Sequence, residues 1–151
     1  MSILPPSSRS GLREVFRNGY MVVRHDPTRK LVVLTRSAAP YASLEDLRAT
    51  FAGMDAALVH VSRPRTALIV DSRKSPARND PAFEAEFTEL RKKFNADFRK
   101  ISILVQTAVG VLQVGRHARM DDTPMGIFTN PGEALAYAGV HMDPGRLDLH
   151  D

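Results

Sequence analysis

The sequence predicts a single-domain α/β protein whose core is a mixed, mostly parallel sheet of five strands. Two features of the pattern predict this class. Two valine-rich segments flank a short polar turn, at residues 20–24 and 31–35, and are typical of a β-hairpin. Further on, short apolar runs alternate with amphipathic segments of helical period, as in parallel strands joined by right-handed helical crossovers. With 151 residues the chain is long enough to bury one proper core.

The first half of the predicted order is strand, strand, helix, strand. The turn of the hairpin reads HDPTRK, in which Asp26-Pro27 favours a reversal of the chain. Ser43 is predicted to begin a helix, because Asp46 stands three residues later and can reach back to the capped end. Apolar residues then recur at spacings of three and four, as one buried helix face requires. The continuous apolar run at 66–70 predicts a strand that is covered on both faces.

The second half alternates helix and strand. Asp80 is predicted to cap a helix with Pro81 at its first position, where the missing N–H costs nothing. One face of this helix is a stripe of large apolar residues, and the opposite face is charged. The remaining elements are predicted in the order strand, helix, strand, helix at residues 101–105, 108–120, 125–129 and 131–138, with Asn130 as the last cap and Gly139 as the last stop.

The two ends of the chain differ in pattern from this core. Residues 1–18 combine prolines, serines and alternating charge, and are predicted to form a mobile N-terminal arm with at most one short helix around residues 12–16. Residues 19–139 form the predicted domain. Residues 140–151 are predicted to be a C-terminal tail that makes only loose contacts.

Two stretches carry a resemblance to a known family. GIFTNPGEALAYAG at 126–139 joins a short strand to an alanine-bearing helix, with Tyr137 where relatives often have tryptophan, and ISILVQTAVGVLQVGRHARM at 101–120 is similar to the strand and helix that precede it there. With the order of elements over residues 19–139, these stretches resemble the STAS superfamily, most closely its SpoIIAA-like branch. The resemblance implies a non-enzymatic α/β module that regulates by binding a protein or, in some relatives, a small ligand.

The loop after the third predicted strand shows how far this resemblance extends. In the best-known relatives, the anti-sigma-factor antagonists, a serine at the start of the next helix is phosphorylated by a partner kinase, which ends binding. Here Asp80 holds the cap position and already satisfies the free N–H groups, so the phospho-serine switch is predicted to be absent. Ser72 and Ser75 are the loop's candidates for phosphorylation.

The same loop gives the first functional hypothesis, a regulatory module that binds a protein partner such as a kinase or an anti-sigma-type regulator. Its arginines and lysine would supply charge complementarity and speed of association more than affinity. The competing interpretation is a solubilising surface. The predicted partner-binding residues are Asp71, Arg73, Lys74, Arg78, Asp80 and Thr107.

The aromatic stripe supports a second hypothesis, a carrier domain for a small molecule or a lipid-like ligand. Phe83, Phe87 and Phe94 would line an apolar pocket beneath their helix, with the basic loop at its mouth. The competing interpretation is that these rings only fill the core, as any packed helix requires.

No pattern in the sequence indicates catalysis, and the protein is expected not to be an enzyme. The chain has no nucleophile elbow, P-loop or dinucleotide fingerprint, and its lack of cysteine excludes thiolate chemistry. No cofactor or metal is expected, because the five histidines lack the i, i+4 spacing of a helical zinc site. A nucleic-acid partner is not expected either, since no helix or strand concentrates basic residues on one face.

Location and assembly follow from the same sequence. No apolar run is long enough to span a bilayer and the N-terminus lacks a secretory core, so a cytoplasmic protein without a membrane span is expected. The open edge of the hairpin is guarded by Arg24, Arg29 and Lys30, which predicts a monomer or a weak homodimer.

Overall fold

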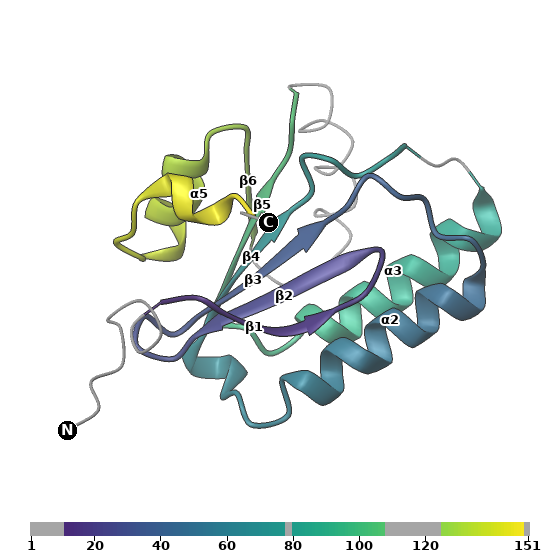
Figure 1. Ribbon diagram of the computed structural model, residues 1–151, viewed down its shortest axis with the longest axis horizontal. Helices are drawn as coiled ribbons and strands as arrows, with labels where there is room; N and C mark the ends of the chain where they lie inside the picture. Colours follow the sequence, from purple (N-terminus) through teal and green to yellow (C-terminus); the bar gives the residue numbers. More distant parts are fainter. Residues whose placement is uncertain (1–10, 78–79, 108–124, 150–151) are drawn as a thin grey trace.

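A computed structural model describes residues 11–77, 80–107 and 125–149, and it contains a mixed sheet of six strands (Figure 1). The strands lie in the sheet in the order in which they occur in the chain. The pairs β1–β2 and β2–β3 are antiparallel, and the third to the sixth strands are parallel. They are β1 (Arg13–Arg17), β2 (Met21–Asp26), β3 (Leu31–Arg36), β4 (Ala67–Asp71), β5 (Lys100–Leu104) and β6 (Met125–Phe128).

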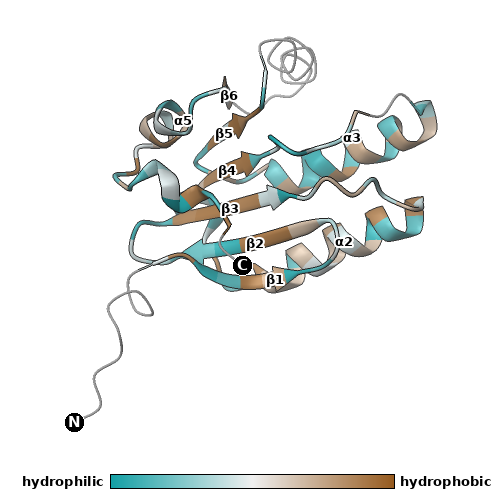
Figure 2. Cartoon of the chain, turned by 45° about the horizontal axis from the view of Figure 1, so that its top comes forward, coloured by the Kyte–Doolittle hydropathy of each residue, from teal (hydrophilic) through white to brown (hydrophobic). Residues whose placement is uncertain are grey.

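Helices cover both faces of the sheet. The two long helices lie on one face and the short C-terminal elements on the other (Figure 1). The central strands are apolar along most of their length, whereas the helices alternate apolar and polar residues (Figure 2). The described helical elements are α2 (Leu44–Ala57), α3 (Pro81–Asn95), α5 (Pro131–Ala138) and the 3₁₀ turns η1 (Arg63–Arg65) and η2 (Pro144–Leu147).

The predicted α/β class is confirmed, and the predicted count of five strands is wrong. The sixth strand is β1, which pairs antiparallel with β2 and comes from residues expected to be an arm or a short helix. The sequence of β1 does not alternate apolar and polar residues, because this edge strand buries mainly Phe16. Its register with β2 also shifts between Glu14 and Phe16. The Phe16 ring occupies the space beside Gly53 of α2, where a Cβ would collide with it. An edge strand anchored by one ring has no periodic signal that a sequence could show.

The local signals of the other elements are confirmed. The hairpin forms as β2 and β3, and the buried Asp26 fixes its turn by accepting a hydrogen bond from the Arg29 backbone N–H at 3.0 Å. Ser43 accepts from the N–H of Asp46 at 3.0 Å, and Asp80 accepts from that of Ala82 at 3.1 Å. At α5, Asn130 is the cap and Gly139 ends the helix with a left-handed φ of 74°. The predicted helix at 108–120 lies outside the described residues.

The C-terminal tail differs from its expectation of loose contacts. Val140 and Leu147 are buried in a second core between the sheet and α5, and Leu147 is 0% exposed. Arg24 of β2 donates to the carbonyl oxygens of Arg146 and Leu147, at 2.9 and 2.7 Å. Two buried apolar side chains and the backbone carbonyls that accept from Arg24 help to hold the tail, and these long-range contacts have no local signal in a polar sequence.

The winding of the sheet determines where a site can form. Both described crossovers, β3–α2–β4 and β4–α3–β5, place their helix on the same face. The carboxyl ends of β3, β4 and β5 therefore lie side by side, and the loops at 37–42, 72–77 and 105–107 follow them. In open α/β sheets, ligands bind at this edge.

Candidate functional site

A pocket opens at the carboxyl ends of β3, β4 and β5, between the sheet and the helices α2 and α3. Its volume is about 390 Å³. This size lies within the range of roughly 300 to 1,000 Å³ in which small ligands bind. Most of its surface is apolar, and its principal walls are Leu34, Phe51, Val70, Phe83, Phe87 and Phe94.

All three phenylalanines that the sequence suggests for a pocket line this one. The rings of Phe83 and Phe87 stack with 6.0 Å between centroids, and Phe51 of α2 meets Phe87 and Phe94 edge-on at 6.2 and 5.9 Å. Phe83 and Phe94 are also buried core residues, whereas Phe87 is half-buried. The stripe therefore serves both interpretations, since the same rings fill the core and form the wall of a cavity.

Arg36 gives the pocket a cationic wall. It is the last residue of β3 and faces the helices together with Leu34, two residues earlier. Only 8% of it is exposed. Its Nη1 donates to the carbonyl oxygens of Ser37 and Ala39 at 2.9 and 2.8 Å, and to that of Tyr20 at 3.3 Å. Its guanidinium carbon lies 4.4 Å from the centre of the Tyr41 ring, which is cation–π distance.

The charge of Arg36 has no partner within the described part of the chain. No carboxylate there lies within ion-pair distance of it, and its Nε and Nη2 make no hydrogen bond with any described residue. Burial lowers the pKa of Arg36, and the nearby Tyr41 and Tyr20 act in the opposite direction. An arginine remains cationic at neutral pH even so. The pocket thus contains a buried positive charge beside apolar walls.

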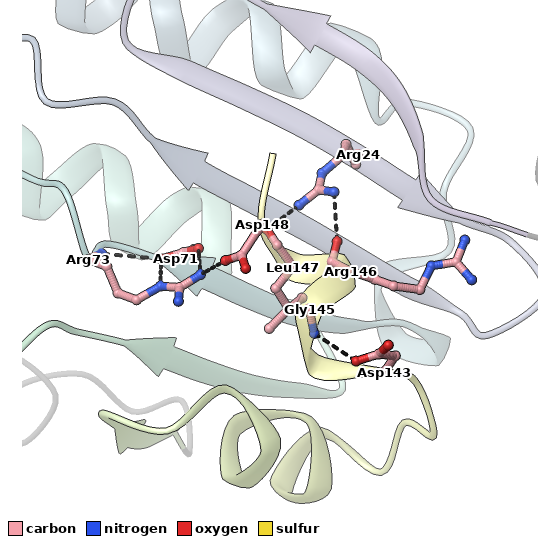
Figure 3. A network of polar contacts seen from close by, with 8 residues as sticks. All are labelled: Arg24, Asp71, Arg73, Asp143, Gly145, Arg146, Leu147 and Asp148. Carbon is pink, nitrogen blue, oxygen red and sulfur yellow. Dashed lines mark hydrogen bonds and ion pairs between the residues drawn. The ribbon is translucent and has the colours of Figure 1, made fainter. Parts of the chain in front are cut away.

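A second polar cluster lies on the opposite face of the sheet, around the C-terminal tail (Figure 3). The buried Asp71 accepts from Nε and Nη2 of Arg73 at 3.0 and 2.8 Å, and the same Nη2 reaches Asp148 at 2.8 Å. Donation to Asp71 raises the pKa of Arg73 against the effect of burial, and Asp148 adds to the rise. Burial lowers the pKa of Arg24, which the carboxylates of Asp71, Asp148 and Glu14 oppose. This cluster fastens the tail to the sheet.

The structure divides the predicted partner-binding residues into two groups. Asp71 is only 4% exposed, and the charge of Arg73 is directed at two carboxylates of the protein itself. Lys74 and Thr107 are exposed, and Asp80 is an exposed helix cap. Arg78 lies outside the described residues. The expected basic face is thus reduced to the exposed rim of the loop.

The two candidate phosphorylation sites differ in their surroundings. The half-buried Ser72 donates its backbone N–H to the carbonyl oxygen of Leu104 at 2.8 Å, which extends the pairing of β4 and β5. Ser75 is exposed, and its backbone N–H donates to the carbonyl oxygen of Ser72 at 3.1 Å, as in a tight turn. Phosphorylation at either serine stays a prediction.

Sequence reasoning missed Arg36 and Tyr41. The signal for Arg36 was present, because it continues the inward alternation of Val32 and Leu34. The predicted strand ends at Thr35, one residue before the end of β3, so Arg36 lies outside the predicted element. Tyr41 lies in the connection before α2 and has no periodic signal of its own.

The residues that the structure describes contain neither a candidate metal centre nor a helix that could span a membrane. Among them, no three histidine, aspartate or glutamate side chains come together in a way that could hold a metal ion. No helix in the same residues has the length and apolar character needed to cross a membrane.

Comparison with known protein families, with curated proteins and with solved structures gave no significant match to the chain.

Proposed function

We propose that this protein is a small, non-enzymatic α/β module that binds a largely apolar small molecule in the pocket beneath α3. The observation that carries the proposal is the cavity of about 390 Å³ with its aromatic walls. A sheet and two helices with this many rings would normally close against one another, because interiors pack as densely as organic crystals. A cavity of this size at the carboxyl ends of parallel strands is where such folds hold ligands.

The family resemblance is part of the proposal. A hairpin followed by alternating helices and strands supports membership of the STAS superfamily, in its SpoIIAA-like branch, where some relatives bind a small ligand. The cap at Asp80 supports a variant without the usual phospho-serine switch, since its side chain already accepts from the N–H of Ala82.

Binding of a neutral, environment-sensitive dye such as Nile red tests the proposal. We expect saturable binding at one site per chain. Val70→Phe places a ring on a pocket wall and is expected to weaken the affinity by about tenfold or more, because it removes the space that a ligand needs. Val59→Phe is the matched control, since Val59 is 71% exposed and does not line the pocket.

Absence of saturable binding in the wild type, or equal binding by both variants, would contradict the proposal. Native mass spectrometry of the purified protein provides an independent check, because a pocket that has acquired its ligand during expression retains an added mass. Circular dichroism of Val70→Phe establishes that a lost affinity is not a lost fold.

A regulatory protein partner is the second candidate function. It is favoured by the exposed Ser75 and Thr107, which both line the pocket mouth, and by the exposed Lys74 beside them. A partner bound at this rim would contact the loops that surround any ligand. Lys74→Glu is expected to lose a partner that the wild type captures, whereas Lys93→Glu, which inverts an exposed charge on α3, is expected to keep it. Equal capture by both variants would exclude the rim.

A further inference from the structure

The Arg36 guanidinium is held in place by two groups of contacts. One nitrogen, Nη1, is committed to backbone carbonyls, and one face of the plane lies over the Tyr41 ring. A guanidinium has five N–H donors, and those on Nε and Nη2 form an adjacent pair with the spacing of a carboxylate. In Arg36 this pair makes no hydrogen bond within residues 11–77, 80–107 and 125–149, and neither nitrogen is a fully buried atom. The fork is therefore held in position on a residue that lines the pocket, and it is not completely buried.

A buried cation without a counter-ion is unfavourable unless something else compensates it. The carbonyl oxygens on Nη1 and the tyrosine ring solvate the charge but do not neutralise it. Lysine or arginine side chains with a purely structural role are usually paired when they are this buried. An anionic group at the fork would supply the missing charge.

The charges around the pocket limit how negative that group can be. Arg73 also lines the pocket, but Asp71 and Asp148 already neutralise it. Glu84 adds a negative charge to the lining. Arg91 is also in the lining and its charge is opposite to that of Glu84, so the lining keeps a net charge of about one positive unit. This net charge fits a monoanion better than a phosphate dianion, and the planar fork of Arg36 fits the two oxygens of a carboxylate.

We propose that the ligand of this pocket is an amphipathic monocarboxylate of the fatty-acid type. Its carboxylate accepts hydrogen bonds from Nε and Nη2 of Arg36, and its chain lies along the walls formed by Phe51, Phe83 and Phe87. This inference rests on the proposed function, and it names the chemical class of the ligand and the residue that recognises it.

Isothermal titration calorimetry, which measures the affinity of two ligands with the same chain length, tests this inference. Decanoate and decyl alcohol differ in the head group alone. We expect the wild type to bind decanoate about tenfold or more tightly than decyl alcohol, because hydrogen bonds to a charged group are the strong ones. Arg36→Met is expected to bind the two ligands equally, with its affinity for decyl alcohol unchanged. Arg65→Met removes the same charge from an exposed residue that does not line the pocket, and is expected to behave as the wild type.

The outcomes separate this inference from the proposed function. Equal affinities in the wild type, or a preference for decanoate that persists in Arg36→Met, would overturn the carboxylate while the pocket remains a binding site. Failure of both ligands and of the neutral dye would overturn the pocket and the carboxylate together. If Arg36→Met does not fold, the Arg36→Lys variant tests the contact between the carboxylate and the fork instead. It keeps the charge and loses the fork, so the preference for decanoate should fall several-fold, and an unchanged preference would overturn the bidentate contact.

Discussion

Two arginines at the same edge of the sheet are held in opposite ways. Arg73, after β4, lies between the carboxylates of Asp71 and Asp148 at 2.8 Å from each. Arg36, at the end of β3, faces the other side of the sheet and has no carboxylate partner among the described residues. The first closes a contact within the protein, and the second leaves a charge at the wall of a cavity. The comparison teaches that the charge of an arginine in a basic loop can be neutralised within the protein. The charge of an arginine at the end of an apolar strand can remain without a carboxylate partner and so can bind a ligand.

The faces on which they lie differ in the same way. The α5 face is closed by the C-terminal tail, whose Leu147 is completely buried. The α2 and α3 face retains a cavity of about 390 Å³ among its rings. A closed face contributes to stability, whereas a hollow one gives up some packing energy to leave room for a ligand.

The largest effect is expected from breaking the closed cluster. Asp71→Ala should lower the free energy of unfolding by about 3 kcal/mol, because it leaves the partly buried Arg73 and Arg24 with less compensation. Arg36→Met should change it by less than about 1 kcal/mol, since the lost carbonyl contacts are offset by the loss of a buried charge. Denaturant unfolding of both variants without ligand measures the difference. Similar losses would show that Arg36 is a structural anchor, and Asp55→Ala, at an exposed ion pair with Arg63, serves as the control with an effect below about 1 kcal/mol.

A smaller effect is expected from loosening the tail. Leu147→Ala should cost about 2 kcal/mol, at the lower end for a buried leucine, because the turn that carries it lies at the surface and can partly collapse. Binding of decanoate by this variant should remain as in the wild type, since the pocket lies on the other face. Thermal unfolding together with titration checks both statements, and a loss of affinity would show that the two faces are coupled.

The smallest expected effect is a pH dependence of the free energy of unfolding. It comes from a histidine that titrates near neutral pH, whereas the two arginines stay charged and do not contribute to it. Burial lowers the pKa of His25, and Asp26 opposes the shift. The unfolded chain therefore binds a proton more readily, so the contribution of His25 to stability is present above about pH 6.5 and is lost as the pH falls through the lower folded value. The change should stay below about 1 kcal/mol because the ring is partly exposed. His25→Gln should abolish this part of the pH dependence, whereas Arg36→Met and Arg73→Met should leave it intact.

Much of the fold was predictable because its signals are local. The caps at Ser43, Asp80 and Asn130 lie within three residues of the N–H groups they bind, and a short window of sequence contains all of each signal. The parts that were missed depend on distant residues. The strand around Phe16 needs Gly53 to make room for its ring, and the tail needs Arg24, which lies 122 residues from Arg146.

The candidate site was predictable only in its apolar half. The phenylalanine stripe shows one wall, but whether that wall meets another side chain or a space depends on Phe51, Val70 and Ile103 from other elements. The partner-binding prediction assumed that Arg73 was exposed, and the acid that occupies it, Asp148, is 75 residues away. Charge in a sequence can be counted, but its neutralisation is a property of the fold.

The strand order of the sheet has a consequence for how the protein is made. Each strand pairs with the one synthesised just before it, from β1 to β6. A chain leaving the ribosome can therefore extend its sheet without waiting for a distant partner, and such sequential pairing keeps the entropy of loop closure low. The segment that carries Leu147 and Asp148 follows all six strands in the chain, so it can fasten onto a sheet whose strands have already been synthesised.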